Sequence, residues 1–303
     1  MMERVVTIGN AGQKMYGIAH EPEAVPDTFK RKIGVLILHS GRQARRGPHK
    51  FYVKVARALC AEGFYVLRYD NRGYGDSEGP EEQTVEEWFS DALRAMAFFH
   101  DSFGLEKLIL WGLCGGAVLA IHCAAKRPEV IDSLVLCNLF YKLEIASYKG
   151  EFKTVYRKLL TFSFWRKIFS ASPIYYIRKG APNVKRLFMR AFFPSQFDKS
   201  FEESAVPYMR SLPESFARAS KPTAFIFATA DPIFSNFEAE LFGHPVWRDH
   251  LKGIPIELSV IEGADHNFSS VEYEKRAIEK SVAWAVNQAT HSNHPPPWTG
   301  IRR

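Results

Sequence analysis

Short, uninterrupted apolar runs alternate with helical patterns over most of this chain. The runs at residues 35–38 and 63–69 are separated by residues 51–61, whose apolar side chains recur with the helical period. The same alternation continues along the chain, with helices expected at 84–100, 117–125 and 272–288 and strands at 107–111, 131–136, 223–228 and 254–261. Strands that are apolar along their whole length are typical of parallel sheets covered by helices on both faces. The sequence therefore predicts an α/β fold with a mostly parallel sheet flanked by helices.

Residues 141–215 interrupt this alternation. They are rich in aromatic side chains and have helical spacing, and residues 141–210 hold 14 Lys or Arg against 5 Asp or Glu. We expect them to form a helical cap inserted between two parts of the core, residues 1–140 and 216–290. The last residues, 291–303, contain three consecutive prolines and few side chains that could pack, so we expect a flexible C-terminal tail.

Cysteine usage and the N-terminal sequence bear on the cellular compartment. The four cysteines lie in apolar runs without a CxxC pair, which favours a reducing environment over a disulfide framework or a zinc site. The first 20 residues lack the apolar core of a secretion signal, and no run reaches the length of a membrane span. We expect a cytoplasmic protein without a metal or cofactor. The chain has no P-loop, helix-turn-helix or zinc-finger pattern, so no nucleic-acid partner is expected.

Residues 108–120, LILWGLCGGAVLA, place a cysteine between glycines where an expected strand gives way to an expected helix. A nucleophile on such a sharp turn needs small residues two positions before and after it, and Gly112 and Gly116 meet that need. The N–H of Gly115 would point to a developing oxyanion, and the helix start would favour a thiolate at Cys114. The alternative is that Cys114 is a small apolar residue buried in a glycine-rich turn.

The order of these elements resembles the α/β-hydrolase superfamily, in which nucleophile, acid and histidine follow one another along the chain. Asp231 stands just after the strand 223–228, and His266 follows the strand 254–261, where that family has its acid and its histidine. The resemblance implies a catalytic triad of Cys114, Asp231 and His266. Simpler interpretations remain for each partner, since Asp231 precedes a proline as many turn residues do and His266 could be a surface histidine.

Two further loops resemble the same superfamily. His39 ends the strand 35–38 and opens the sequence His-Ser-Gly-Arg, and the resemblance implies a second oxyanion-hole donor there, assigned by position to Gly41. Ser40 and Arg42 are its neighbours and could take that role. The loop at 70–79 reads DNRGYGDSEG, and we expect Arg72 and Asp76 to pin it internally as a structural element.

One branch of the superfamily, the α/β hydrolases associated with exosortase A systems, is similar in several short segments. The similar segments are residues 112–114, 41–49, 66–70 and 164–167. The elbow differs from that group after Cys114, where two glycines follow. The resemblance to this branch implies no particular substrate.

A cysteine nucleophile changes the expected chemistry, because a thioester intermediate reacts with amines and thiols more readily, relative to water, than an oxygen ester does. Our leading hypothesis is an acyl hydrolase acting on an ester or thioester through an acyl-cysteine on Cys114. An acyltransferase that passes the group to an amine or hydroxyl acceptor is the alternative, and a non-catalytic ligand-binding protein is a third. The basic, aromatic segment 141–210 could attract the phosphates of a CoA or carrier-protein thioester, or form an ordinary solvated face. The sequence does not identify an oligomeric state.

Overall fold

The computed structural model describes residues 1–9, 13–39, 43–80, 83–141, 199–231, 234, 245–251 and 253–290. The chain divides into two compact units, residues 1–142 together with 207–303, and residues 143–206. Of the second unit only residues 199–206 are described, as the first part of helix α7 (Lys199–Arg210). Most of the expected cap at 141–215 and all of the expected tail at 291–303 lie outside the described residues.

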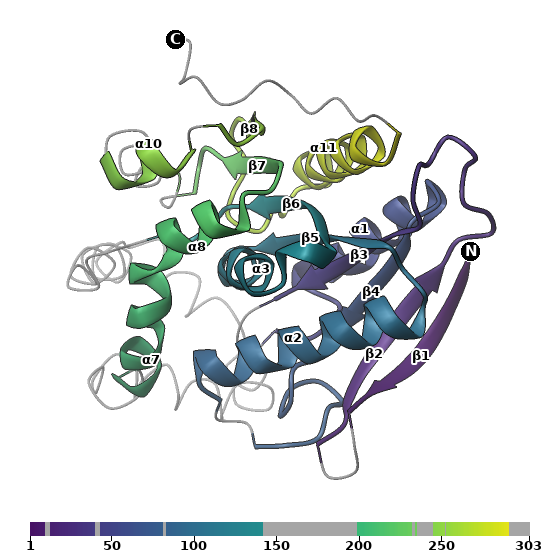
Figure 1. The fold of residues 1–303 in the computed structure, drawn as a ribbon, viewed down its shortest axis with the longest axis horizontal. Coiled ribbons are helices and arrows are strands. Elements are labelled where there is room, and N and C mark those ends of the chain that lie inside the picture. The colour runs from purple at the N-terminus through teal and green to yellow at the C-terminus, as the bar shows by residue number, and fades with distance from the viewer. Residues whose placement is uncertain are drawn as a thin grey trace, which may run out of the picture. The chain divides into compact units, whose positions relative to one another are not determined.

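A single sheet organises the first unit. Among the described residues it has eight strands in the order β1-β2-β4-β3-β5-β6-β7-β8 (Figure 1). The strands are β1 (Met2–Ile8), β2 (Met15–Glu21), β3 (Ile33–Leu38), β4 (Tyr65–Tyr69), β5 (Lys107–Leu113), β6 (Ile131–Cys137), β7 (Thr223–Ala228) and β8 (Ile256–Ile261). The pairings β1–β2 and β2–β4 are antiparallel and all others are parallel. The predicted mostly parallel sheet is confirmed, with an antiparallel hairpin added at one edge.

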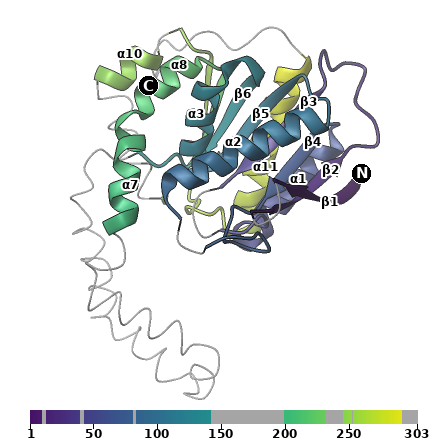
Figure 2. The same ribbon diagram turned by 60° about the horizontal axis from the view of Figure 1, so that its bottom comes forward.

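Helices cover both faces of this sheet. They are α1 (Phe51–Ala61), α2 (Val85–Ser102), α3 (Gly115–Lys126), α8 (Leu212–Ala219), α10 (Pro245–Leu251) and α11 (Val271–Thr290), with 3-10 turns η1 (Pro48–Lys50) and η2 (Pro128–Val130). Helices α2 and α3 lie on one side of the sheet and α1 and α11 on the other (Figure 2). Side chains of α2, α3 and α8 form one apolar cluster, and side chains of α1 and α11 contribute to a second. Of the helices described, none combines the length and apolarity needed to cross a bilayer.

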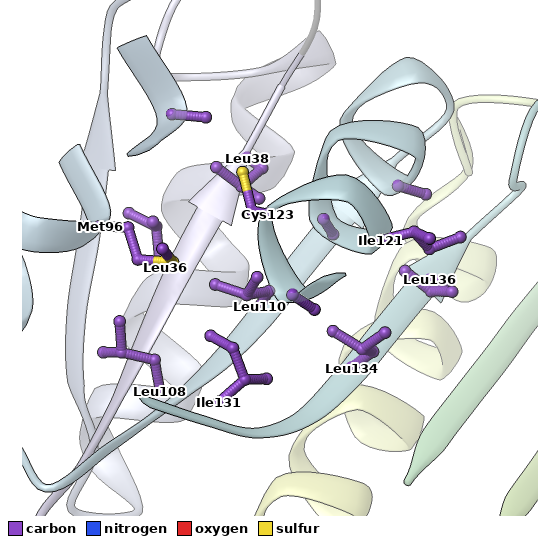
Figure 3. Packing of buried hydrophobic residues seen from close by; sticks show 14 of the residues in the cluster. Leu36, Leu38, Met96, Leu108, Leu110, Ile121, Cys123, Ile131, Leu134 and Leu136 are labelled. Carbon is purple, nitrogen blue, oxygen red and sulfur yellow. The ribbon is translucent and has the colours of Figure 1, made fainter. Parts of the chain in front are cut away.

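The cluster under α3 shows why the central strands are apolar throughout. Leu36 of β3, Leu110 of β5 and Leu134 of β6 point to the same face, where Ile121 and Cys123 of α3 lie against them (Figure 3). The alternate residues of the same strands enter the opposite cluster with α1 and α11. A strand buried on both faces has no solvated position, so its sequence becomes a continuous apolar run.

The start of α2 follows the local pattern in the sequence. Thr84 Oγ1 accepts a hydrogen bond from the Glu87 N–H at 3.3 Å, and the Glu87 carboxylate accepts one from the Thr84 N–H at 2.7 Å. This reciprocal capping box satisfies two N–H groups at the first turn that have no partner within the helix.

The segment just after residue 206 packs with the first unit. Leu212 and Phe216 of α8 are buried in the cluster over α3, and the Phe216 ring lies 5.8 Å from that of Trp247 in α10. Tyr141, before the second unit, contacts the same Trp247 ring. Leu212, Phe216 and Tyr141 thus belong to the apolar core of the first unit.

Candidate active site

Cys114 lies at the turn between β5 and α3. Its backbone has φ 57° and ψ −119°, a left-handed conformation that is unusual for a residue with a Cβ atom and that costs about 1–3 kcal/mol. The Cys114 N–H donates to the Cys137 carbonyl at 2.9 Å, which ties the turn to the end of β6. The side chain is half-buried at the N-terminus of α3, whose dipole favours a negative charge there.

The glycines on either side allow this turn to be so tight. A Cβ atom at Gly112 would lie 2.4 Å from the backbone carbonyl of Gly116. One at Gly116 would lie 2.3 Å from the Leu38 carbonyl oxygen, at the end of β3. Both neighbours are backbone atoms that cannot rotate away. The small residues expected around Cys114 are thus required by the close approach of α3 to β5 and β3.

His266 connects Cys114 to a buried carboxylate. Its Nδ1–H donates to Asp231 Oδ2 at 2.5 Å, and the ring is also hydrogen-bonded to the Cys114 side chain. Because Asp231 occupies Nδ1, the remaining ring nitrogen Nε2 is the one left for the thiol. The structure thereby brings together the three side chains predicted as a triad, whose catalytic roles are taken up below.

The protonation of His266 follows from these neighbours. Burial lowers its pKa, but hydrogen bonds to Asp231 and Cys114 and the negative charges of both groups outweigh that effect and raise the pKa to about 10. The ring is therefore an imidazolium at neutral pH when its partners are ionised. A positively charged histidine beside a sulfur atom at a helix N-terminus is the environment that activates cysteine nucleophiles.

The loops that carry Asp231 and His266 are bonded to each other. The Ala230 N–H donates to the Ala264 carbonyl at 2.9 Å, and the Gly263 N–H donates to Thr229 Oγ1 at 2.8 Å. Asp265, the carboxylate next to His266 in the sequence, instead accepts hydrogen bonds from the N–H and the hydroxyl of Ser269 and closes the turn after His266. The Asp265 carboxylate therefore stabilises the loop, while the Asp231 carboxylate is hydrogen-bonded to the His266 ring.

The expected oxyanion hole is only partly within the described residues. Gly115 is the first residue of α3, a position whose N–H has no acceptor within the helix. Gly41, with Ser40 and Arg42, lies outside the described residues. His39, just before them, is buried, and its Nε2–H donates to the Tyr69 carbonyl at 2.6 Å. Burial lowers the pKa of His39, against smaller opposing effects of the Tyr69 carbonyl and the Asp70 charge, which favours a neutral structural ring.

Tyr52 is a neighbour of Cys114 that the sequence did not single out. It is fully buried in α1, and its hydroxyl donates to Gln43 Oε1 at 2.6 Å. Burial raises the pKa of Tyr52, and the charges of Cys114 and Cys137 raise it further, so the phenol stays protonated. Its sequence signal is weak because a tyrosine in an apolar helix face is ordinarily part of the core.

The side chains of Arg72 and Asp76 in the loop at 70–79 bond to other segments of the chain. Arg72 Nε donates to Asp91 Oδ1 of α2 at 2.6 Å, and Asp76 accepts Arg45 Nη2 at 2.5 Å. Arg45 also pairs with the buried Asp70 carboxylate. The expectation that Arg72 and Asp76 pin the loop internally is therefore wrong as to their side-chain partners, because Asp91 of α2 and Arg45 lie within reach of them; within the loop, the Asp76 N–H donates to Asp70 Oδ2 at 3.2 Å.

The fold, together with the hydrogen-bonded side chains of Asp231, His266 and Cys114 at the carboxyl ends of its strands, is that of the α/β hydrolases. Comparison with known sequences makes this more specific: the chain belongs to the family described as "Serine aminopeptidase, S33", which it matches over residues 33–269. The family's description specifies serine, whereas this chain has Cys114 at the elbow.

Curated relatives match over a limited stretch. Lysophosphatidylserine lipase ABHD12 of Danio rerio is 31% identical over 135 residues, which are 43% of this chain and 34% of that protein. Protein ABHD12B of Homo sapiens is 29% identical over 128 residues, which are 41% of this chain and 34% of that protein. The match thus spans about a third of the length of these relatives.

Solved structures share the fold over nearly the whole chain. Est1E from Butyrivibrio proteoclasticus with ferulic acid bound has a TM-score of 0.63 at 15% identity, over 94% of this chain and 100% of that one. A proline iminopeptidase from Mycobacterium smegmatis has a TM-score of 0.57 at 17% identity, over 96% and 100%. Dienelactone hydrolase from Anabaena variabilis has a TM-score of 0.57 at 16% identity, over 94% and 97%. At these identities the likeness concerns the fold alone.

Proposed function

We propose that the protein is an acyl hydrolase that cleaves an ester or thioester through an acyl-cysteine intermediate on Cys114. The observation that carries this proposal is the hydrogen-bonded series from Asp231 through His266 to Cys114, with Cys114 on a strained turn at a helix N-terminus. A nucleophile, a base within hydrogen-bond reach and a third group that orients the base are the parts that covalent acyl transfer requires.

In the first half-reaction the Cys114 thiolate attacks the acyl carbon and a carbon–sulfur bond forms. The carbonyl electron pair moves onto oxygen, where the N–H of Gly115 and a second donor, assigned to Gly41, stabilise it. Collapse of this intermediate breaks the bond to the leaving group, which takes its proton from the His266 imidazolium. Cys114 then carries the acyl group as a thioester, and His266 is neutral.

In the second half-reaction water takes the place of the leaving group. Neutral His266 removes a proton from water as the oxygen attacks the thioester carbon, and the carboxylic acid product leaves. The thiolate and the imidazolium are restored. Asp231 keeps the His266 ring in the tautomer with the proton on Nδ1, which leaves Nε2 free to accept a proton. It also stabilises the positive charge of the ring in both half-reactions.

The relatives favour ester-like substrates without specifying one. The ABHD12 protein is named a lysophosphatidylserine lipase, so carboxylic esters are the substrate class we propose.

The test is intact-mass measurement after mixing the protein with p-nitrophenyl acetate or a short acyl-thioester. We expect an adduct of one acyl group on the wild-type chain and none on Cys114→Ala. Cys60→Ala is the matched control, because Cys60 is a buried cysteine in α1, and it should be acylated as the wild type is. Turnover without any adduct, or an adduct that survives Cys114→Ala, would overturn the proposal.

Acyl transfer is the second candidate, and the cysteine itself favours it because amines intercept thioesters efficiently. Adding amine or hydroxyl acceptors to the same assay separates the two activities. A transferase turns over faster with its acceptor and releases an acylated product, while a hydrolase releases only the free acid. If Cys114→Ser raises hydrolysis, the cysteine serves transfer rather than hydrolysis.

Three expectations from the sequence stay predictions. The first is that the donor is a CoA or carrier-protein thioester, attracted by the basic segment 141–210. The other two are a cytoplasmic location and a relationship to the exosortase A-associated hydrolases.

A further inference from the structure

The carboxyl end of β6 is hydrogen-bonded to the Cys114 turn, to the His266 loop and to the end of β7, from which the Asp231 loop departs. The Cys137 carbonyl, at the last residue of β6, accepts the Cys114 N–H at 2.9 Å. The next residue, Asn138, is fully buried and has φ 42°. Its N–H donates to the Ile226 carbonyl of β7 at 2.9 Å, so the chain stays aligned with β7 after the parallel strand has ended.

The Asn138 carboxamide extends these contacts in two directions. Nδ2 donates to the His266 carbonyl at 2.8 Å, and Oδ1 accepts the Ala228 N–H at 2.8 Å. The Ala228 carbonyl in turn accepts the Asp231 N–H at 3.2 Å. One side chain therefore joins the histidine loop to the strand end from which the acid loop departs.

The partners determine the residue type at this position. A carbonyl can only accept and a backbone N–H can only donate, so the position needs a donor and an acceptor on one short side chain. It also needs a left-handed backbone, which among residues with a side chain Asn and Asp tolerate best. Glycine meets only the backbone requirement, and ionised aspartate lacks the donor. Asparagine meets all three.

We infer that Asn138 is a positioning residue that keeps His266 in line with Cys114 and Asp231. The inference rests on the proposed function, because it concerns the geometry of the same triad. The bond at the His266 carbonyl sets the position of the backbone from which the ring extends. Displacements of about 1 Å at a catalytic group can cost about a hundredfold in rate, so this bond bears directly on turnover.

The first test is Asn138→Gly, which keeps the left-handed backbone and removes both side-chain bonds. With p-nitrophenyl acetate as the probe we expect kcat to fall by about 10- to 100-fold and KM to stay within about twofold. NMR titration of His266 should show a pKa below that of the wild type, because a displaced ring loses part of its bonding to Asp231 and Cys114. The charge of nearby Asp265 is the same in both proteins.

Asn138→Asp, assayed at a pH at which the new carboxyl group is ionised, separates the two directions, because it keeps the acceptor for the Ala228 N–H, loses the donor to the His266 carbonyl and adds a negative charge there. We expect kcat to stay as low as in Asn138→Gly. If kcat in Asn138→Asp is restored to the wild-type value, the Asn138 side chain acts only by holding the end of β7, and the inference is overturned.

Thr223→Ala controls for general loss of stability. Thr223 is buried at the amino end of β7, opposite the strand ends that carry the site, and its hydroxyl donates to the Lys221 carbonyl at 2.8 Å, so its removal should lower the unfolding temperature while leaving kcat and the His266 pKa unchanged. An unchanged His266 pKa and kcat in Asn138→Gly would refute the positioning role of Asn138 but would leave the proposed function standing. A missing adduct on Cys114 would refute the proposed function, whatever Asn138 does.

Discussion

Two opposing influences act on the His266 imidazole, and each can be removed separately. Burial lowers its pKa, while the bonds to Asp231 and Cys114 raise it to about 10. We expect Cys114→Ala to lower this pKa, because a hydrogen bond and a negative charge disappear together. In the double variant Cys114→Ala, Asp231→Asn the His266 pKa should fall well below that of the wild type, since burial is then opposed by the charge of Asp265 but no longer by Cys114 and Asp231.

Proton NMR of the imidazole ring measures this directly, with His266→Gln identifying the signal. A His266 pKa that stays near 10 in Cys114→Ala would contradict the contribution of Cys114 to the raised pKa. The signals of the other histidines should be unchanged in both variants, which separates a local effect from a loss of fold.

Residue by residue, the sequence predicted the site best where the chemistry has a positional signature. Cys114 is recognisable because a strand, two flanking glycines and a helix surround it, and Asp231 and His266 each follow a predicted strand. Asn138 also follows a strand, but the sequence gives no sign of which backbone groups its carboxamide meets 90 and 128 residues away. Gly41 remains a prediction, outside the described residues.

At the scale of elements, the close approach of α3 to β3 predicts that a side chain at Gly116 destabilises the fold. In a helix with free space, Gly→Ala would stabilise the fold by about 0.8–1 kcal/mol. Here the added methyl group would lie 2.3 Å from the Leu38 carbonyl oxygen, so we expect Gly116→Ala to lower the free energy of unfolding by about 1–3 kcal/mol and to displace the elbow.

Urea denaturation and the rate of Cys114 acylation measure the two effects. Gly104→Ala is the control: it adds a methyl group in open space, costs about 1–2 kcal/mol of left-handed backbone strain and should leave acylation unchanged. Stabilisation by Gly116→Ala would contradict the tight contact.

Elements whose pattern is strong in the sequence appear where they were expected. The helix predicted at 51–61 and the strand predicted at 223–228 have the bounds of α1 and β7. The hairpin of β1 and β2 was not predicted, because β1 buries only Val6 and Ile8 and gives almost no apolar run. An edge strand is specified largely by the neighbour it pairs with, which local sequence does not reveal.

For the whole molecule, buried histidines make stability depend on acid. Burial is the main cause that lowers the pKa of His20 and of His122, each to about 4, and His39 is lowered in the same direction. Below about pH 6.5 the unfolded chain binds protons that the folded chain does not. The free energy of unfolding should therefore fall as pH drops from 6.5 toward 4, by about 1.4 kcal/mol per pH unit for each such histidine at full effect.

Thermal unfolding at a series of pH values between 7 and 5 measures this slope. His122→Gln should flatten it, because one buried titrating ring is removed from the face of α3 that meets Tyr208. His100→Gln is the control, since His100 contacts only the exposed Asp101 among the polar partners described for it. A slope unaffected by His122→Gln would contradict the assignment. His266 has the opposite sign, and its contribution is lost as pH rises through about 10.

The burial of the cysteines determines which thiols of the folded protein can react. All four belong to the described residues, and Cys114 alone among them is not buried. Burial raises the pKa of Cys60 to about 11 and raises those of Cys123 and Cys137 as well, so these three are poor thiolates in the folded chain. Thiol-directed electrophiles thus distinguish Cys114 from the rest without any engineering. The number of thiols that react, one in the folded protein and four after unfolding, makes the natural sequence a reporter of its own folded state.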